Sequence, residues 1–242
     1  MKGIILAGGT GSRLGKLTAV VNKHLIGIGD TPMIEFPIAT LKTMGFNEMI
    51  VVTGAEHAGT VTQYLANVHP EIDFTYKIQQ KAGGIAQALS LTKNICKGHN
   101  LAVILGDNIF QEDFSEEARR FEQNNKGARI FLKEVSYEGA KRFGCAVIDG
   151  EKVKYVEEKP ENPKTNLAMT GLYMFDSKIF EIINTLIPSA RNELEITDAI
   201  RKYVDSDNCY YSFIKGFWSD AGTRESLFNA IDFLRQNPKT FQ

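Results

Sequence analysis

The chain has 242 residues, and 28 lysines and arginines against 29 aspartates and glutamates leave a formal net charge of -1. This composition is typical of a soluble globular domain that needs no disulfide, and the near-zero charge argues against a nucleic-acid partner, which usually selects a basic excess. No apolar run approaches the about 20 residues of a membrane span and the Ile4 to Ala7 run is no signal peptide, so we expect a cytoplasmic protein with neither a nucleic-acid nor a membrane partner.

The first half of the chain alternates short β-rich runs with amphipathic segments of helical length. We predict strands at Gly3 to Ala7, Glu48 to Thr53, Phe74 to Ile78 and Leu101 to Leu105. Because apolar positions recur every three or four residues, we predict helices at Pro32 to Met44, Gly59 to Val68, Gly84 to Ile95 and Ser115 to Asn125. This alternation is typical of a Rossmann-like, doubly wound α/β fold with a largely parallel sheet.

After Gly127 the pattern becomes β-rich. Strands are predicted at Ala128 to Val135, Cys145 to Ile148, Lys152 to Glu157 and Ala168 to Phe175. These strands indicate a β-rich insertion or subdomain. The end of the chain returns to α/β, with helices at Ser177 to Leu186, Glu195 to Tyr203 and Glu225 to Arg235, and a strand at Tyr210 to Ile214.

A glycine-rich segment, Gly8-Gly9-Thr10-Gly11-Ser12-Arg13, follows the first strand. Glycines let backbone N–H groups converge on an anion, and the hydroxyls and the arginine add donors. The dinucleotide fingerprint fails because Leu14 replaces its third glycine, and the Walker pattern aligned on Gly15-Lys16 fails as well. The segment therefore predicts a phosphate-binding loop, with a tight turn that merely needs glycine as the alternative.

Two aspartates follow predicted strands. Asp107 lies just after Leu105, at the edge of the sheet where the glycine-rich loop leaves, and Asp220 lies in a turn beyond Ile214. A carboxylate beside phosphates needs a cation between them, and Mg²⁺ binds through one or two carboxylates plus substrate phosphates. The alternative for each aspartate is a helix N-cap.

Further charged residues lie at strand and helix ends. Lys159 can neutralise a second phosphate and Glu158 can accept hydrogen bonds from hydroxyls, unless the pair forms an exposed turn. The segment Arg191 to Asp198 is typical of an ordinary helix start with acidic residues in its first turn. The three cysteines and four histidines show no ligand spacing, so we expect no metal held by them.

Eight segments in order resemble the sugar-1-phosphate nucleotidylyltransferases, most closely those that act on glucose 1-phosphate with a thymidine nucleotide. The segments are Leu6 to Leu14, Asn22 to Leu25, Gly84 to Ala88, Leu105 to Asn108, Glu157 to Pro160, Thr170 to Tyr173, Glu193 to Asp198 and Trp218 to Thr223. The resemblance runs from Lys2 to about Leu227 and implies a mixed sheet of nucleotidyltransferase type with a β-rich sugar-binding insertion. It implies one domain over residues 1–242, with a nucleotide-binding half (1–127) and a sugar-phosphate-binding half (128–242).

The resemblance also implies roles for individual residues. Those for the nucleotide are Leu6, Gly8, Gly9, Thr10, Gly11, Ser12, Arg13, Lys23, Gln79, Gly84 and Asp107. Those for the sugar phosphate are Asn108, Gly144, Glu158, Lys159, Met169, Gly171 and Arg191. Mg²⁺ would bind to Asp107 and Asp220, and the catalytic residues would be Arg13, Lys23, Asp107, Lys159 and Arg191.

The implied reaction joins dTTP and glucose 1-phosphate to give dTDP-glucose and pyrophosphate. The alternatives are a uridylyltransferase that makes UDP-glucose and a non-catalytic sugar-nucleotide sensor of the same fold. The identity of the hexose, the pathway and the oligomeric state stay open, with a homodimer as one option.

The sequence departs from the family pattern at two places. Gly15-Lys16 and Gly27 stand where the family has an aromatic residue and prolines, and Gly27 loosens the turn after Lys23. Because the chain stops at Gln242, we expect neither the C-terminal helical region of longer members, which is tied to tetramer contacts, nor their regulatory nucleotide site.

Overall fold

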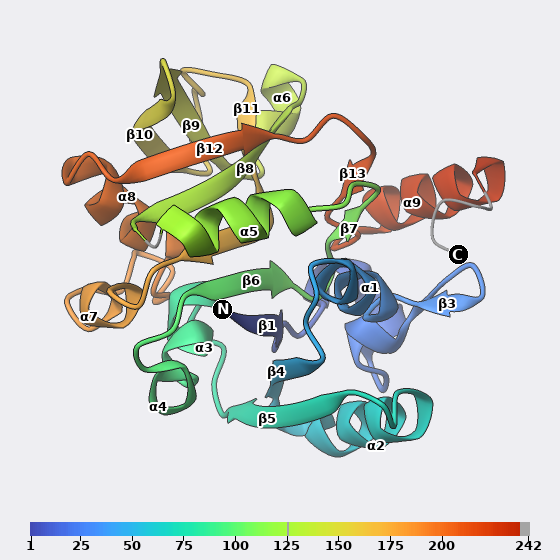
Figure 1. Cartoon of the computed structure of the whole chain (residues 1–242). Coiled ribbons are helices and arrows are strands. Elements are labelled where there is room, and N and C mark those ends of the chain that lie inside the picture. The colour runs from blue at the N-terminus through green and yellow to red at the C-terminus, as the bar shows by residue number, and fades with distance from the viewer. Residues whose placement is uncertain (125, 238–242) are drawn as a thin grey trace.

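A nine-stranded mixed sheet runs through the molecule, in the strand order β5-β4-β1-β6-β11-β8-β12-β10-β9 (Figure 1). The computed structural model describes residues 1–124 and 126–237. At one edge β5 (Asp73–Gln79), β4 (Glu48–Gly54), β1 (Lys2–Ala7) and β6 (Leu101–Leu105) are parallel. These are the four strands that the first half of the sequence predicts, and each prediction is confirmed.

The β-rich strands of the second half extend this same sheet and form no separate sheet. They are β11 (Leu167–Phe175), β8 (Ala128–Glu134), β12 (Cys209–Phe213), β10 (Lys152–Glu158) and β9 (Gly144–Asp149). β11 is antiparallel to β6 and to β8, which makes the sheet mixed as expected. Ala168 of β11 also pairs with Cys145 of β9, so this part of the sheet curls back on itself.

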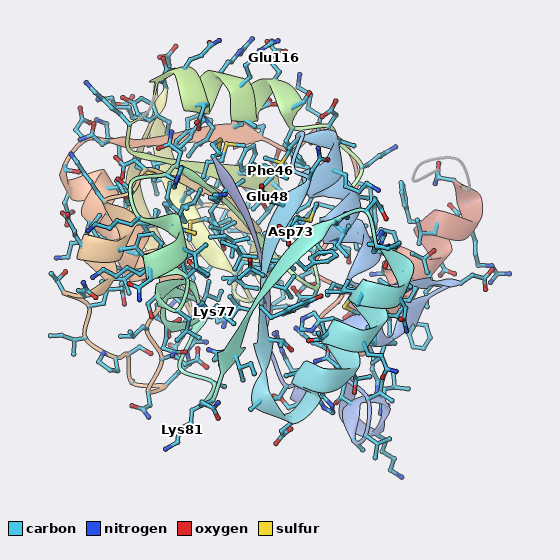
Figure 2. All side chains as sticks on the ribbon, turned by 60° about the horizontal axis from the view of Figure 1, so that its bottom comes forward. Phe46, Glu48, Asp73, Lys77, Lys81 and Glu116 are labelled. Carbon is cyan, nitrogen blue, oxygen red and sulfur yellow. The ribbon has the colours of Figure 1, made fainter. Side chains whose placement is uncertain are left out.

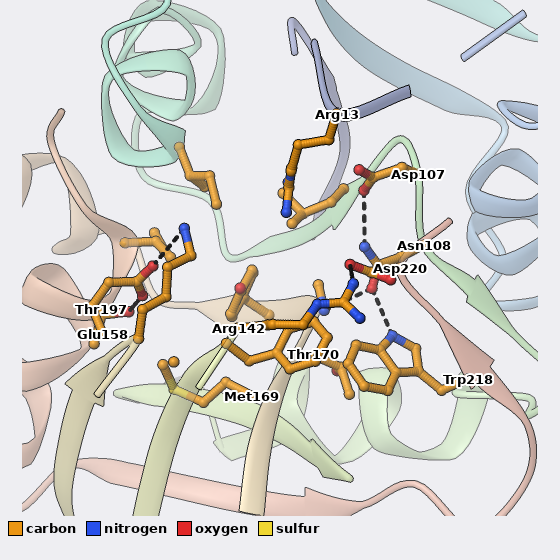
Figure 3. A pocket seen from close by; sticks show the side chains of 18 residues that line it. Arg13, Asp107, Asn108, Arg142, Glu158, Met169, Thr170, Thr197, Trp218 and Asp220 are labelled. Carbon is orange, nitrogen blue, oxygen red and sulfur yellow. Dashed lines mark hydrogen bonds and ion pairs between the residues drawn. The ribbon is translucent and has the colours of Figure 1, made fainter. Parts of the chain in front are cut away.

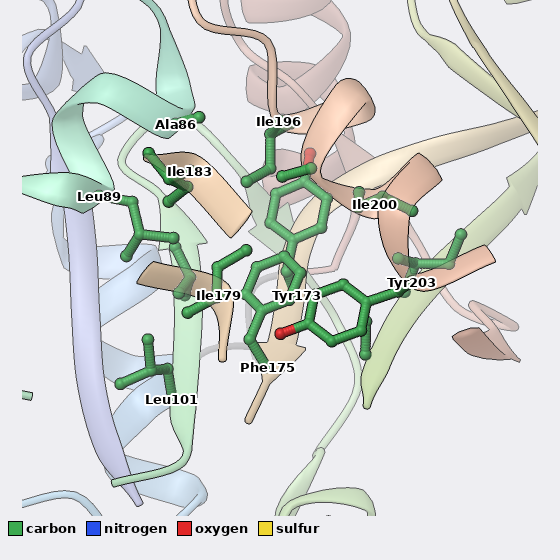
Figure 4. Close-up of a cluster of buried hydrophobic side chains, with 14 of the residues drawn as sticks. Ala86, Leu89, Leu101, Tyr173, Phe175, Ile179, Ile183, Ile196, Ile200 and Tyr203 are labelled. Atoms are coloured by element: carbon green, nitrogen blue, oxygen red, sulfur yellow. The ribbon is translucent and has the colours of Figure 1, made fainter. Parts of the chain in front are cut away.

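Helices cover both faces of the sheet, as a doubly wound fold requires. Successive side chains of a strand point to opposite faces, so Ile5 and Ala7 of β1 pack with α1 (Glu35–Thr43), α2 (Ala58–Val68) and α5 (Ser115–Asn124). Ile4 and Leu6 pack on the other face with α3 (Ile85–Ser90), α4 (Lys93–Cys96), α7 (Ile179–Ile183) and α8 (Ile196–Asp205). In Figure 4, Ala86 and Leu89 of α3 lie near Ile179 and Ile183 of α7 within this second cluster.

The edge strand β5 carries charged side chains. Figure 2 shows Asp73 and Lys77 along this strand, and both are at least partly exposed. Charges on an edge strand oppose pairing with the edge of another sheet.

Three helix predictions have wrong boundaries. The helix predicted from Pro32 begins at Glu35, because Thr31–Pro32 forms β3 and pairs with β2 (Gly27–Ile28). The helix predicted from Gly84 to Ile95 is divided into α3 and α4, and the one from Ser177 to Leu186 is shortened to α7. Asn125, the predicted end of another helix, lies outside the described residues.

Short elements that the sequence analysis does not predict gather at the carboxyl ends of the parallel strands. They are η1 (Ser12–Thr18), η2 (Lys23–Leu25), η3 (Ala55–His57), β7 (Ile109–Phe110), α6 (Tyr137–Ala140) and β13 (Trp218–Ser219). β7 and β13 pair antiparallel, with Ile109 opposite Ser219, and α9 (Arg224–Gln236) follows. This pairing brings the segment after Asp107 beside the segment before Asp220. Within the described ranges, no helix is both long and apolar enough to cross a membrane.

Candidate active site

The glycine-rich loop leaves β1 at the carboxyl edge of the parallel strands, where ligands of doubly wound sheets bind. A Cβ on Gly8 would lie 2.2 Å from Oε1 of Gln79, and a Cβ on Gly9 would lie 3.2 Å from Nζ of Lys23. Gly11 has a φ of 71°, a left-handed conformation that favours glycine. The glycines therefore serve close packing as well as a turn, because two polar side chains lie directly against the loop backbone.

Lys23 and Asp107 form a nearly buried ion pair at the base of this loop. Nζ of Lys23 lies 2.5 Å from Oδ2 of Asp107. Burial pushes the pKa of Asp107 up, but nearby positive charge, chiefly that of Lys23, and hydrogen bonds from Lys23 and Asn108 together outweigh it, so the pKa lies below its usual value. Asp107 is therefore ionised near neutral pH. No helix follows it, since the chain enters β7, and the N-cap alternative for Asp107 is wrong.

A cleft of about 660 Å³ opens over the loop. All the residues predicted to bind the nucleotide line it: Leu6, Gly8, Gly9, Thr10, Gly11, Ser12, Arg13, Lys23, Gln79, Gly84 and Asp107. Gln79 is buried, and its Nε2 donates to Oε1 of Gln87 at 2.7 Å. These residues combine a glycine-rich backbone, the cations Arg13 and Lys23, and an amide side chain held in place.

A second cavity of about 130 Å³ adjoins the cleft (Figure 3). It contains Asn108, Gly144, Met169 and Gly171 among its lining residues, all predicted to contact the sugar. Oδ1 of Asn108 accepts hydrogen bonds from the backbone N–H of Gly171 at 2.9 Å and from Nε1 of Trp218 at 2.7 Å. A Cβ on Gly144 would lie 2.3 Å from Cε of Met169, so that contact needs glycine or a shift of the flexible methionine.

Glu158 lies at the boundary of the two cavities and joins several predicted residues. Thr197 Oγ1 donates to one carboxylate oxygen of Glu158 at 2.5 Å, while Lys159 at 3.3 Å and Arg191 at 3.2 Å pair with the other. Lys159 has a φ of 45°, rare for a residue with a side chain and frequent at functional sites, and its N–H donates to the Phe143 carbonyl at 3.0 Å. The alternative of a plain exposed turn is therefore disfavoured.

Arg191 lies at a different place from the other residues predicted to bind the sugar phosphate. It lines the larger cleft and is absent from the lining of the smaller cavity. Its Nη2 lies 3.2, 3.8 and 2.9 Å from carboxylate oxygens of Glu158, Glu193 and Glu195. Its charge is therefore compensated by three acidic residues.

Asp220 enters the smaller cavity from the turn before α9. Thr223 forms the cap of that helix and accepts from the N–H of Ser226, so the N-cap alternative for Asp220 is wrong. Burial and the charge of Asp107 raise the pKa of Asp220 above its usual value. The effect of Asp107 on Asp220 indicates that the two carboxylates share one electrostatic environment.

Several residues that line the site were missed by the sequence analysis. Arg142 lines both cavities and pairs with Asp220, Thr197 orients Glu158, and Trp218 orients Asn108. His24 lines the cleft fully buried, and burial with the charge of Lys23 lowers its pKa to about 3, so it is neutral. Thr197, Trp218 and His24 lie inside the motif segments, and Arg142 lies two residues before Gly144, so proximity to a motif was the available signal.

A glycine-rich cleft and a second polar cavity that share a wall of charged side chains suit an enzyme that joins two phosphorylated molecules. The comparisons agree with this class. The Nucleotidyl transferase family profile matches residues 2–237. The glucose-1-phosphate thymidylyltransferase of Neisseria meningitidis is 35% identical over 97% of this chain and 83% of its own length. The enzyme of the same name from Mycobacterium tuberculosis is also 35% identical, over 97% of this chain and 82% of its own length.

Solved structures show the same fold. A Bacillus anthracis structure, named as a glucose-1-phosphate thymidylyltransferase in complex with sucrose, has a TM-score of 0.91 and 44% identity over 97% of this chain and 95% of that one. A UDP-glucose pyrophosphorylase with UDP-glucose has a TM-score of 0.87 at 23% identity over 98% of each chain, which supports the fold alone. The chain belongs to the nucleotidyl transferase family and is an enzyme of sugar-1-phosphate nucleotidyl transfer. The alternative of a non-catalytic sensor is set aside.

Proposed function

We propose that this enzyme transfers the thymidylyl group of dTTP to glucose 1-phosphate, with dTDP-glucose and pyrophosphate as products. One observation carries the proposal: the two cavities share a charged wall that includes Arg13, Asp107, Glu158 and Lys159. Two polyanions can meet there only if cations neutralise them, and the wall supplies cations from both halves of the chain. The relatives named above support thymidine and glucose as the two partners.

In this proposal the nucleotide-binding half is residues 1–127, and the sugar-phosphate-binding half is residues 128–242. The glycine-rich loop, from Gly8 to Arg13, and Lys23 hold the triphosphate. Lys159 and Arg191 hold the sugar phosphate, while Glu158 accepts hydrogen bonds from the hexose hydroxyls. Because Arg191 lies only on the larger cleft, it would meet the phosphate from the nucleotide side.

The reaction needs no side-chain nucleophile. An oxygen of the sugar phosphate attacks the α-phosphorus of the nucleotide, and the electron pair of the breaking P–O bond leaves with pyrophosphate. Catalysis of such a displacement is positioning and charge neutralisation. Arg13 stabilises the departing pyrophosphate, and Lys159 with Arg191 orients the attacking phosphate.

The acidic residues fit a divalent cation that is bound together with the substrates. Among residues 1–124 and 126–237 no group of three or more His, Cys, Asp or Glu could hold a metal ion. Asp107 and Asp220 alone suit Mg²⁺, which keeps waters and takes phosphate oxygens to complete its coordination. The raised pKa of Asp220 means that burial and the charge of Asp107 disfavour its ionised form. A cation bound between the two carboxylates would relieve this repulsion. When bound, Mg²⁺ would supply Lewis-acid neutralisation of the phosphates.

Gln79 and Gly84 are our candidates for recognition of the base. Both line the cleft beside the loop, and the Gln79 amide is held by Gln87 and by the Gly84 carbonyl at 3.4 Å. An amide and a backbone group can match the donor and acceptor pattern of a pyrimidine edge. Thymine and uracil differ by one methyl group, worth only about 1 to 3 kcal/mol in a pocket, so UTP is the nearest competitor.

A substrate grid tests the proposal. Pyrophosphate release is measured for dTTP, UTP, ATP, CTP and GTP, each with the 1-phosphates of glucose, galactose, mannose and N-acetylglucosamine. We expect the highest kcat/KM for dTTP with glucose 1-phosphate, about tenfold above UTP. A higher value for UTP would instead assign a uridylyltransferase, and a higher value for another sugar would replace glucose.

A further inference from the structure

Arg142 is a cation of the site to which neither the motifs nor the resemblance assigns a role. It lies between α6 and β9 and lines both the nucleotide cleft and the smaller cavity. Figure 3 shows Arg13 and Arg142 projecting into the smaller cavity from opposite sides. Since the reacting phosphates must meet where the two cavities join, Arg142 lies at the junction that carries the chemistry.

The contacts of Arg142 leave its head group free to exchange partners. Nη2 lies 3.3 Å from Oδ2 of Asp220 and 3.5 Å from Oγ1 of Thr223. The guanidinium lies 5.4 Å from the ring centre of Phe143, which packs against Trp218 at 5.1 Å. Packed aromatic rings thus support the side chain, while its charge is matched by the Asp220 carboxylate at 3.3 Å.

Arg191 provides the contrast. Three carboxylates lie within 3.8 Å of its guanidinium, and it lines only the larger cleft. To bind a phosphate at the junction, Arg191 would have to give up several close partners. Arg142 has to give up Asp220, the same carboxylate that a divalent cation would take, and a 3.5 Å contact with the Thr223 hydroxyl.

We propose that Arg142 is a further catalytic residue, whose guanidinium leaves Asp220 and binds the reacting phosphates once both substrates and the cation occupy the site. This role extends the proposed function. It rests on that function in one respect, that two phosphorylated substrates meet at this junction. Arg142 donates N–H groups to non-bridging oxygens of the α-phosphate while the sugar phosphate oxygen forms its new bond to phosphorus. No proton is transferred, and the electron pair still leaves with pyrophosphate.

The exchange has an electrostatic reason. In the structure Arg142 neutralises part of the charge on Asp220, which is buried close to Asp107. A divalent cation on the two carboxylates would neutralise Asp220 in its place, and the Arg142 guanidinium would then be available to the incoming phosphates. The same arginine therefore balances acidic residues before binding and balances phosphates during the reaction.

Kinetics of Arg142→Ala, Arg142→Lys and the neighbouring control Lys141→Ala test the catalytic role. Lys141 pairs with Glu138 at 2.6 Å and lines neither cavity. All are assayed with the nucleotide and sugar phosphate that wild type uses best, so a wrong base or sugar in the proposed function leaves this comparison intact. We expect Arg142→Ala to lower kcat on the order of 100-fold, Arg142→Lys to keep part of it, and Lys141→Ala to stay near wild type.

Rescue separates chemistry from folding. Free guanidinium added at millimolar concentration should restore part of the kcat of Arg142→Ala. It should not restore the kcat of a variant lacking Asp107. The Tm of Arg142→Ala should stay near wild type. Unchanged kcat in Arg142→Ala, or a loss that follows a lowered Tm without rescue, would overturn the catalytic role.

A binding measurement tests the exchange at Asp220 without turnover. Free Mn²⁺ is titrated against wild type, Arg142→Ala and Lys141→Ala by electron paramagnetic resonance, with no nucleotide present. We expect Arg142→Ala to bind Mn²⁺ more tightly than the other two, because the competing guanidinium is gone. Equal affinity in all three proteins would show that Arg142 and the cation do not compete for Asp220.

Discussion

The two cavities of the site are built by the chain in opposite ways. The larger cleft, which we assign to the nucleotide, takes six consecutive lining residues, Gly8 to Arg13, from one loop after the central strand β1. The smaller cavity takes lining residues from β6, β9, β10, β11, α8 and β13, with one to four residues from each, and others from the loops between elements. The wall of the larger cleft, which we call the nucleotide wall, is made mainly of backbone. The wall of the smaller cavity, which we call the sugar wall, is made of side chains brought together by the curled end of the sheet.

This difference governs what each wall tolerates. In the glycine-rich loop a single added methyl meets Gln79 or the Lys23 side chain, so the loop accepts little change. On the sugar side, Glu158 and Asn108 are each oriented by neighbours from other elements. We therefore expect substitutions in the first wall to affect the nucleotide and those in the second to affect the sugar phosphate, except where both walls share a residue.

The largest effect is expected at the carboxylates Asp107 and Asp220, since a cation on both would join the two walls. Asp107→Asn and Asp220→Asn should each lower kcat on the order of 100-fold or more. The double variant should lose far less activity than the two single losses multiplied together. EDTA should abolish activity and Mg²⁺ should restore it. The measurement is turnover over a Mg²⁺ titration.

Asp198→Asn is the matched control, because Asp198 pairs with Arg201 at 3.0 Å on α8 and lines neither cavity. It should keep turnover near wild type. Full activity in either the Asp107 or the Asp220 variant would remove the shared cation from the mechanism.

The next largest effect separates Arg13 from Lys159, which both line both cavities. Arg13→Ala should impair the forward reaction and pyrophosphorolysis alike, on the order of 10- to 100-fold, because in our proposal its charge stabilises the pyrophosphate. Lys159→Ala should act mainly on the KM for glucose 1-phosphate. Saturation curves for each substrate in both directions make the distinction. If Lys159→Ala weakened dTTP and left glucose 1-phosphate unchanged, the division between the walls would be wrong.

The sequence could predict the nucleotide wall because its residues are contiguous or follow recognisable strands. The four parallel strands and the glycine-rich loop depend on local patterns, and the structure confirms the strands and groups all the predicted nucleotide residues in one cleft. Their roles stay predictions.

The sugar wall depends on long-range pairing that no local pattern contains. The contact of Gly144 with Met169 requires β9 to pair with β11, and Arg142 meets Asp220 only because β7 pairs with β13. The periodicity of apolar residues also predicted the wrong start for α1. Thr31–Pro32 pairs with Gly27–Ile28 as a short strand, and periodicity within one segment does not predict pairing with another. Residues such as Arg142 and Trp218 were missed for the same reason.

A smaller effect is expected at Gln79, on the nucleotide wall alone. Gln79→Ala should raise the KM for dTTP about tenfold and lower kcat less, because a base contact is made equally in the ground state and the transition state. The KM for glucose 1-phosphate should stay constant, ATP and GTP should remain poor substrates, and the exposed Gln123→Ala should match wild type. If the KM for dTTP did not change in Gln79→Ala, other residues would have to recognise the base. The proposed phosphate chemistry would be unaffected.

The smallest effect concerns the anchoring of the sugar wall, away from both cavities. Helix α8 begins at Ile196 and supplies Ile196 and Thr197 to the smaller cavity, while its Tyr203 hydroxyl donates to Oδ1 of buried Asp176 at 2.7 Å. Tyr203→Phe removes one of two donors to that oxygen, which keeps the Lys178 N–H at 3.1 Å, so we expect the free energy of unfolding to fall by about 1 to 2 kcal/mol.

Asp176 keeps the backbone N–H of Gly127 at 2.8 Å on its other oxygen, and the ring of Tyr203 keeps its stacking on Phe175 at 6.0 Å. The helix should therefore stay in place, with kcat and the KM for dTTP near wild type and at most a small rise in the KM for glucose 1-phosphate. Urea unfolding and the two saturation curves measure these quantities together. If the KM for dTTP rose more than the KM for glucose 1-phosphate, the two walls would not be independent. Helix α8 supplies residues to the smaller cavity, and such a result would mean that it acts on the larger cleft.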